Sequence, residues 1–316
     1  MTATTAGPHG SLNLSTERER FAAALFDRLW NTYRDRVTYV QQYEQLVSQA
    51  GAKFHNDHIA FRTLTSQMPL AGIGTIARIF EALDYRIAGA YQFDDKHLSA
   101  LHLQHAHPQF PKLFVSELQT WKLSAAARSA IASATSQHRP AIDQETLARL
   151  HHLDQETEFA RADLLAAVVR QFEEVPWPPI ERATLAAVNQ ESQYAAWVLV
   201  HGYNVNHFTS LINSHGAAAL DDIEKTAAAL AKAGVPMKPE IEGERGSKLR
   251  QTATEAVTID VGVLDQQQPI TIPWSYAYFE LAQRDLVLDP ATGKYQRFEG
   301  FLGPQATNLF EMTRVK

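Results

Sequence analysis

The strongest fold signals in this sequence are HNDHIAFRTL at residues 55–64 and YNVNHFTSLI at residues 203–212, which both repeat with the two-residue period of a β-strand. A helical pattern follows each of them, at 72–84 and at 219–233. Three further strands are predicted after each helix, near 85–93, 98–106 and 112–119, and near 237–242, 250–263 and 270–284. The order βαβββ therefore occurs twice, which predicts an internal duplication whose copies form one curved sheet around a site.

The segments around these two copies are predicted to be mostly helical. Thr16 and Glu19 have the spacing of a capping box, so we expect a long helix from residue 16 to Gly51 that packs across the sheet. The Ala-rich segment 122–195 carries apolar residues three and four apart, which indicates a helical insertion between the copies. Residues 1–15 are expected to be a disordered tail.

The predicted fold class is α+β, with an N-terminal helix, a helical insertion and one domain over residues 16–316. Its parts are module one at about 52–120, the insertion at about 122–195, module two at about 200–290 and a C-terminal helix at about 300–314.

The composition of the 316 residues excludes several classes of protein. Cysteine is absent, so there are no disulfides and any metal must be held by His, Asp or Glu. The formal net charge is −6 and there is no run of Lys and Arg, which argues against nucleic acid as a partner. No apolar stretch approaches the roughly 20 residues of a membrane-spanning helix, and residues 1–14 lack the features of a targeting segment. We therefore expect a soluble cytoplasmic protein, of unknown oligomeric state.

Alternation along the first strand of module one places His58 and Arg62 on the same face. Four residues at ~3.3 Å each separate their Cα atoms by roughly 13 Å, a gap that a guanidinium and a small diacid can fill together. In module two, His207 occupies the position that corresponds to His58, and Glu280 falls inside an apolar strand where a carboxylate is costly without a cation.

Two neutral imidazoles and one carboxylate form the facial triad typical of non-haem Fe(II) enzymes. Zinc uses the same residue types for hydrolysis, so spacing alone leaves the metal open. A structural use is also possible for each residue: a strand histidine is often part of the core, and Glu280 could pair with Arg284. Glu117, the counterpart of Glu280 in module one, could be a fourth ligand, although a structural role is favoured.

Five short motifs in this order resemble the 2-oxoadipate dioxygenase/decarboxylase family, whose members are also called 2-hydroxyglutarate synthases. The motifs are DHIAFRTL around His58 and Arg62, NVNHFTS around His207, LRQTAT at 249–254, YFELAQR around Glu280, and GFLGPQATNLFEMT at 300–313. The resemblance implies a fold similar to the vicinal oxygen chelate enzymes, with Fe(II) held by His58, His207 and Glu280. It also implies that Arg62 binds a substrate carboxylate and that Gln251 contacts the substrate.

The leading functional hypothesis is therefore an Fe(II) dioxygenase that converts 2-oxoadipate and O2 to 2-hydroxyglutarate and CO2. One alternative keeps the pocket with zinc or nickel, as in lyases or isomerases of the glyoxalase kind, which consume no O2. A second alternative is a small-ligand-binding protein without turnover, in which the helical insertion serves as a partner surface.

Overall fold

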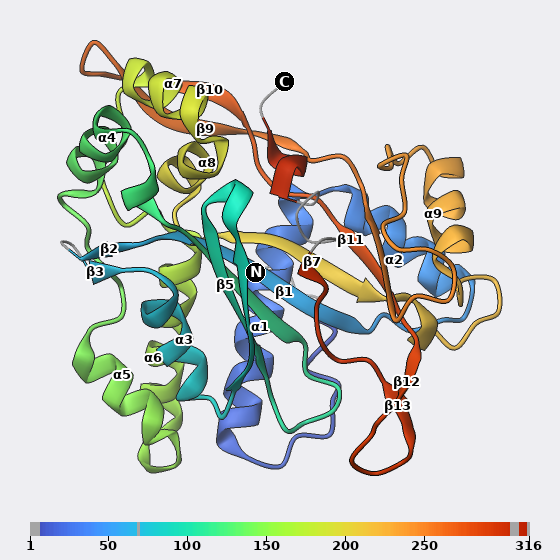
Figure 1. The fold of residues 1–316 in the computed structure, drawn as a ribbon. Coiled ribbons are helices and arrows are strands. Elements are labelled where there is room, and N and C mark those ends of the chain that lie inside the picture. Colours follow the sequence, from blue (N-terminus) through green and yellow to red (C-terminus); the bar gives the residue numbers. More distant parts are fainter. Residues whose placement is uncertain (1–6, 68–69, 304–309, 315–316) are drawn as a thin grey trace.

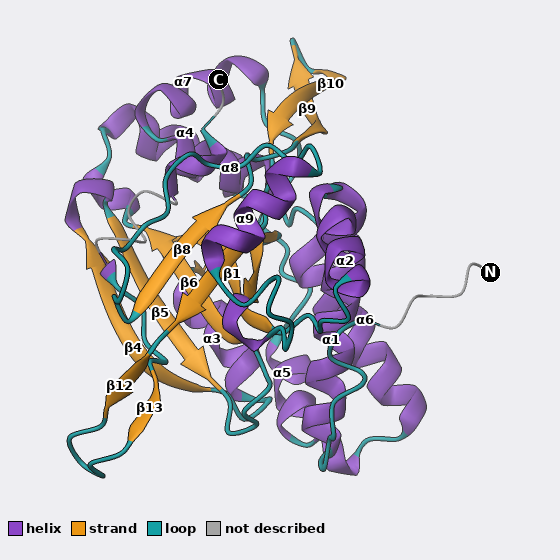
Figure 2. Ribbon diagram, turned by 90° about the vertical axis from the view of Figure 1, so that its right-hand side faces the viewer, coloured by secondary structure: helices purple, strands orange, loops and turns teal. Residues whose placement is uncertain are grey.

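A seven-stranded mixed sheet forms the centre of the protein in the computed structural model, which describes residues 7–67, 70–303 and 310–314. The sheet curls around one of its faces, and helices cover the other (Figures 1 and 2). In spatial order its strands are β4 (Arg86–Phe93), β5 (Leu98–Gln104), β6 (Lys112–Leu118), β1 (Asn56–Leu64), β7 (Val205–Leu211), β11 (Glu280–Arg284) and β8 (Leu249–Ala253).

The first strands of the two modules, β1 and β7, lie side by side in the middle of this sheet and run antiparallel. On its other side β1 pairs in parallel with β6, and β7 pairs in parallel with β11. The next strand outward is antiparallel in both cases, β5 against β6 and β8 against β11. This arrangement confirms the predicted α+β fold and places equivalent strands of the two modules on either side of the β1–β7 pair.

The face of the sheet that turns away from the site is covered by helices. The predicted helix over 16–51 is in fact two helices, α1 (Glu17–Arg36) and α2 (Tyr39–Gln49), which are separated at Val37 and Thr38. Two consecutive β-branched residues lower helix propensity at that break. Trp30 and Tyr33 of α1 each pack with a ring-centre distance of 5.0 Å on Phe208 of β7. The side chain of His207, next to Phe208, is consequently directed to the opposite face.

The insertion contains the helices α4 (Ala125–Thr135), α5 (Gln144–His151), α6 (Glu158–Glu173), α7 (Arg182–Glu191) and α8 (Gln193–His201). The last of them continues six residues past the predicted end at 195, because the mostly apolar residues from Tyr194 to His201 are all buried. While α6 packs on α1, α8 returns to β1. The insertion therefore reaches the central sheet and does not remain a peripheral module.

Three of the strand predictions for module two are wrong in detail. The segment 237–242 makes only isolated bridges, from Met237 to Thr254 and from Glu242 to Gln251, because Pro236 and Pro239 remove two of the donors that a ladder needs. The predicted strands 250–263 and 270–284 are each interrupted. The C-terminal part of the first becomes β9 (Thr258–Asp265), and the N-terminal part of the second becomes β10 (Gln268–Ser275). These two strands pair with each other as a separate hairpin.

The remaining elements are short or match their predictions. They are α3 (Ile73–Glu81), α9 (Ile223–Lys232), the strand pairs β2 (Ser66–Gln67) with β3 (Leu70–Ala71) and β12 (Leu286–Leu288) with β13 (Tyr295–Arg297), and the 3-10 turns η1 (Asp94–Lys96), η2 (Thr120–Lys122), η3 (Leu153–Gln155), η4 (Ile212–Ser214) and η5 (Phe310–Thr313). Most of the predicted C-terminal helix at 300–314 lies outside the described residues, and its described end is η5.

Part of the predicted N-terminal tail packs against α1. His9 is 2% exposed, and its Nδ1 lies 2.7 Å from the Asp27 carboxylate. Residues 1–6 of this predicted tail lie outside the described residues.

None of the helices in the described residues combines the length and the apolar character that crossing a membrane requires. The predicted cytoplasmic location stays a prediction.

Candidate metal centre

Two β-bulges shape the site, one immediately before each of the two predicted histidine ligands. Between β1 and β7, Asn56 pairs with Ser210 and His58 with Thr209, so Asp57 is an extra residue on β1. Further along, Ala60 pairs with His207 and Phe61 with Val205, so Asn206 is an extra residue on β7. A bulge redirects side chains locally. It explains why Asp57 reaches the ring of His58 and why Asn206 reaches the ring of His207.

The structure brings His58, His207 and Glu280 together on the concave face. Nε2 of His58 and Nε2 of His207 are 3.3 Å apart, and the Glu280 carboxylate lies 3.4 Å from the first and 3.3 Å from the second. These separations leave a point about 2 Å from all three groups, which is the length of a metal bond to imidazole or carboxylate. In the described part of the chain, this is the one group of His, Asp and Glu side chains that the geometry marks as able to hold a metal ion.

Each of the three side chains is oriented by a polar neighbour. His58 Nδ1 donates to Asp57 at 2.7 Å, and His207 Nδ1 donates to Oδ1 of Asn206 at 3.1 Å, so both Nε2 atoms are turned toward the common point. Gln251 on β8 donates through Nε2 to Oε1 of Glu280 at 2.6 Å. The other oxygen of Glu280, Oε2, is buried and makes no hydrogen bond within the described residues. An orphaned carboxylate oxygen that lies 3.3 Å from an imidazole nitrogen fits a metal site.

Burial controls the charge of these groups. It lowers the pKa of His58, although Asp57 opposes the shift, and it lowers the pKa of His207 well below its usual range. Both imidazoles are therefore neutral, the form in which histidine binds a metal. Burial also raises the pKa of Glu280 to about 8, although the hydrogen bond from Gln251 opposes this. A cation at the common point would favour the ionised carboxylate.

The Asp57 carboxylate is itself held by a buried arginine. Nε of Arg284 donates to Oδ1 of Asp57 at 2.6 Å and Nη2 donates to Oδ2 at 2.9 Å, and both side chains are 0% exposed. Arg284 also donates to the carbonyl oxygens of Phe298 and Gly300. Its guanidinium lies 5.1 Å from the ring centre of Phe301, which packs edge-on against His58. Arg284 thus links the support of His58 to the segment that covers it, and it does not pair with Glu280.

Thr209 lies between two of the candidate ligands in the sheet register, opposite His58 on β1 and Glu280 on β11. Its hydroxyl lies 3.0 Å from Nε2 of His58 and donates to it, because Nδ1 of that ring carries the proton. The lone pair that accepts this bond is the one that a metal would use. Ion binding would therefore release the Thr209 hydroxyl.

Arg62 lies four residues after His58 on β1, and its side chain lines the same cavity. Its guanidinium carbon lies 5.0 Å from the ring centre of Tyr194 and 5.1 Å from that of Trp197, so α8 of the insertion supplies two aromatic faces. Nη1 of Arg62 donates to Oγ1 of Thr313 at 2.7 Å. Sequence reasoning did not assign either aromatic residue to the site, although their spacing of three on a helix places them on one side.

The cavity between Arg62 and the candidate ligands is small. Its volume is about 30 Å³, and it is lined by the three candidate ligands together with Ala60, Phe61, Arg62, Phe114, Ser116, Asn206, Gln251, Tyr278 and Phe301. That volume has room for roughly one or two water molecules. A six-carbon acid can enter only if the surrounding segments move outward.

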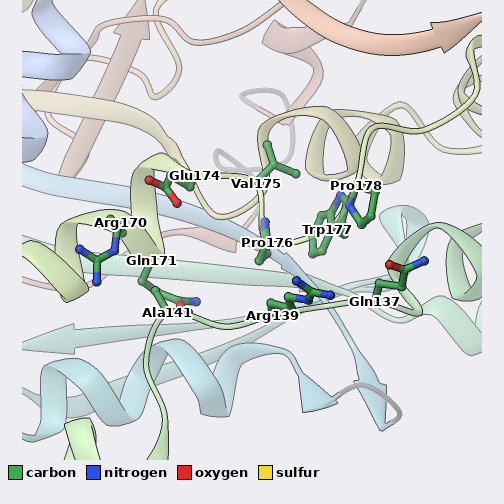
Figure 3. Close-up of a pocket in the computed structure, with 10 residues that line it drawn as sticks. All are labelled: Gln137, Arg139, Ala141, Arg170, Gln171, Glu174, Val175, Pro176, Trp177 and Pro178. Atoms are coloured by element: carbon green, nitrogen blue, oxygen red, sulfur yellow. The ribbon is translucent and has the colours of Figure 1, made fainter. Parts of the chain in front are cut away.

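A wider hollow of about 320 Å³ lies on the insertion, between Gln137, Arg139, Arg170 and Trp177 (Figure 3). It contains no histidine and a single carboxylate, that of Glu174. Arg139 and Arg170 in this hollow are both exposed. The chemistry-bearing residues are in the smaller cavity.

Glu117 does not join the candidate ligands. Its Oε2 accepts from the backbone N–H of Ile73 at 2.8 Å, at the N-terminus of α3. This is the structural use that the sequence favoured for the counterpart of Glu280.

Comparison with known proteins gives a family match over most of the chain. The model of the family described as 2-oxoadipate dioxygenase/decarboxylase matches residues 22–301. The chloroplastic 2-oxoadipate dioxygenase/decarboxylase of Arabidopsis thaliana is 25% identical over 278 residues, which cover 81% of this chain and 67% of that protein.

Two solved structures share the fold. A putative glyoxalase superfamily protein from Ralstonia eutropha JMP134 has a TM-score of 0.80 and 24% identity, with 94% of this chain and 92% of that chain covered. The hydroxyglutarate synthase of Oryza sativa, solved in complex with 2-oxoadipate, has a TM-score of 0.75 and 22% identity, with 95% and 94% covered. The family match spans most of the chain, and by it this protein belongs to the 2-oxoadipate dioxygenase/decarboxylase family.

Proposed function

We propose that this protein is a non-haem Fe(II) dioxygenase that converts 2-oxoadipate and O2 to 2-hydroxyglutarate and CO2. The observation that carries the proposal is the approach of two neutral imidazoles and one carboxylate to within 3.3–3.4 Å of one another on one wall of a cavity that is also lined by an arginine. Family membership supports the reaction class. Both oxygen atoms of O2 end in 2-hydroxyglutarate, one in the carboxylate formed at the former keto carbon and one in the new hydroxyl group, while CO2 carries the original C1 carboxylate oxygens.

Three protein ligands on one face leave the opposite positions for substrate and O2, which suits iron. Bound Fe(II) would supply the redox chemistry that allows O2 to react with a 2-oxo acid. The chain's own residues fix the donors: Asp57 and Asn206 set the histidine tautomers, and Gln251 orients the carboxylate. The apolar lining from Phe61, Phe114 and Phe301 excludes water around them.

Arg62 is proposed to bind the distal carboxylate of the acid through two parallel, charge-assisted hydrogen bonds. The rings of Tyr194 and Trp197 hold the guanidinium plane in place for that contact. Gln251 is proposed to contact the product, because its Oε1 makes no hydrogen bond in the described part of the chain and can accept from the new hydroxyl. Thr313 accepts from Nη1 of Arg62, so the distal carboxylate of the acid would replace this contact.

The direct test is product analysis with ferrous protein, 2-oxoadipate and isotopically labelled O2. The expected result is doubly labelled 2-hydroxyglutarate and unlabelled CO2 in equal amounts, with neither formed without O2. Turnover without O2 consumption, with zinc or nickel bound, would instead identify a lyase or isomerase of the glyoxalase kind. Tight binding of the acid without any turnover under aerobic, iron-replete conditions would identify a binding protein.

Arg62→Lys tests the acid-binding role separately. Lysine keeps the charge but cannot form the two parallel bonds, so kcat/KM for 2-oxoadipate should fall by a factor of at least about ten. The matched substrate is 2-oxohexanoate, which has the same chain without the distal carboxylate and should be affected far less. Equal losses with both substrates would remove Arg62 from this role.

A further inference from the structure

The side chain of Asn206 has a fixed orientation and one unused group. It occupies the bulge on β7 directly before His207, and it is 2% exposed. If His207 binds an ion through Nε2, its Nδ1 must carry the proton and needs an acceptor. The amide oxygen Oδ1, 3.1 Å away, is that acceptor. The Oδ1 contact therefore determines which end of the amide faces His207 and which end is left over.

The end that is left over is the amide nitrogen Nδ2, a donor of two hydrogen bonds. It is buried and has no hydrogen-bond partner among the described residues, although Asn206 lines the cavity with His207, Arg62 and Ser116. Buried donors in folded proteins are nearly always satisfied, so an orphan in a cavity points to a bound group that supplies the acceptor. The acceptors that the cavity is proposed to receive are the oxygens of a 2-oxo acid.

The position of Asn206 in the sheet fits such a contact. Ala60 is opposite His207 and Phe61 is opposite Val205, so the bulged residue lies on the side of His207 that faces Arg62 along β1. An acid that extends from the ion toward the Arg62 guanidinium passes this point. The equivalent residue of module one, Asp57, cannot act in this way, because both of its oxygens are occupied by His58 and Arg284.

We infer that Asn206 is a substrate-binding residue, whose Nδ2 donates a hydrogen bond to an oxygen of the 2-oxo acid while its Oδ1 holds His207. The inference rests on the proposed function, because it takes the acid to be the occupant of the cavity. It assigns two separable tasks to the two ends of one amide.

Two variants separate these tasks. Asn206→Asp keeps an oxygen for the His207 N–H, as Asp57 does for His58, but it replaces the donor by an acceptor that repels a carboxylate. Asn206→Ala removes both groups without adding a charge. Asn204→Ala is the matched control, because Asn204 is also buried near β7 but its amide nitrogen is satisfied by the carbonyl oxygens of Glu173 and His201.

The experiment is anaerobic calorimetry with Co(II), a redox-stable probe of the metal site, followed by 2-oxoadipate at saturating Co(II). Asn206→Asp should bind Co(II) at least as tightly as the native protein but bind the acid at least tenfold more weakly. Asn206→Ala should bind Co(II) more weakly and, once saturated with it, still bind the acid several-fold more weakly. Asn204→Ala should match the native protein in both titrations.

Native affinity for the acid in Asn206→Ala at saturating Co(II) would overturn the substrate contact and leave Asn206 with its positioning task alone. Equal loss of acid binding in Asn204→Ala would also overturn it, because the effect would then be structural. If the Co(II)-loaded native protein itself does not bind the acid, the proposed function fails and the inference fails with it. Acid binding by the native protein together with unchanged binding by the variants would contradict the inference alone.

Discussion

In both modules a β-bulge residue supports the histidine that follows it, but this residue is charged in one module and neutral in the other. In module one, the bulged residue is Asp57, a carboxylate that is neutralised by the fully buried Arg284. In module two, the bulged residue is Asn206, a neutral amide with one end unused. The two modules therefore share the backbone geometry and differ in the charge of the bulged side chain. We interpret the module one half as the rigid side of the site and the module two half as the side that faces the substrate.

The largest expected effect comes from removing the cation from the module one half. Arg284→Met leaves the Asp57 charge buried without its partner, so the free energy of unfolding should fall by about 3–5 kcal/mol. Chemical denaturation of the metal-free protein measures this. The double variant Asp57→Asn with Arg284→Met should recover a large part of the loss. A single variant as stable as the double would show that the ion pair is not what supports this half.

Asp57→Asn makes the module one half resemble the module two half. The amide keeps an acceptor for His58 but sets an N–H group against the N–H groups of Arg284, so the imidazole loses its firm orientation. Losing such a support typically costs about 10- to 100-fold in metal affinity. Anaerobic Co(II) titration is the measurement, with Asn206→Asp, the reverse exchange, as its control. An affinity that is unchanged in Asp57→Asn would mean that the charge of Asp57 is irrelevant to His58.

Glu280 lies beside the histidines of both modules, and its buried carboxyl group predicts that the stability of the metal-free protein depends on pH. In the metal-free folded protein its pKa is about 8, against an ordinary value of 4.5, so its contribution to stability is complete below about pH 4.5 and is lost as the pH rises toward 8. Buried His58 and His207 act in the opposite direction, but only below their ordinary pKa of 6.5. Between pH 6.5 and 8, Glu280 therefore determines the sign.

The melting temperature of the metal-free protein should consequently fall as the pH rises from 6.5 to 8. Glu280→Gln removes the titrating group and should flatten this slope. A native protein whose melting temperature rises over the same window, or a variant that keeps the native slope, would contradict the assignment of this effect to Glu280.

The sequence allowed the central part of the site to be predicted. The four-residue spacing of His58 and Arg62 and the matching place of His207 follow from strand periodicity, and the cost of an unpaired carboxylate in an apolar strand singled out Glu280. The α+β class followed from the order of elements, and the internal duplication stays a prediction. These inferences depend on local patterns, which a single sequence contains.

What the sequence could not show depends on contacts between distant segments. Arg284 lies in the same motif as Glu280 but pairs with Asp57, which is 227 residues away. Tyr194 and Trp197 are ordinary apolar helix residues until α8 is placed against β1. The bulges at Asp57 and Asn206 leave strand periodicity almost unchanged, so nothing local distinguishes them from regular strand positions.

The breaks in the strands of module two have a similar origin. Residues 276–279 are all buried. A strand buried on both faces and a buried connection between strands give the same apolar run, so the sequence pattern cannot distinguish them. The hairpin of β9 with β10 arises because these segments pair with each other instead of continuing along the main sheet.

The most direct test of the account is the metal content of four proteins prepared with ferrous iron under anaerobic conditions. They are the native protein, His207→Ala, Glu280→Ala and Glu117→Ala, the last of which removes the counterpart of Glu280 in module one. Elemental analysis should find one iron per chain in the native protein and in Glu117→Ala, and almost none in the other two. Full iron occupancy in His207→Ala and Glu280→Ala would contradict the claim that one ion joins the two modules.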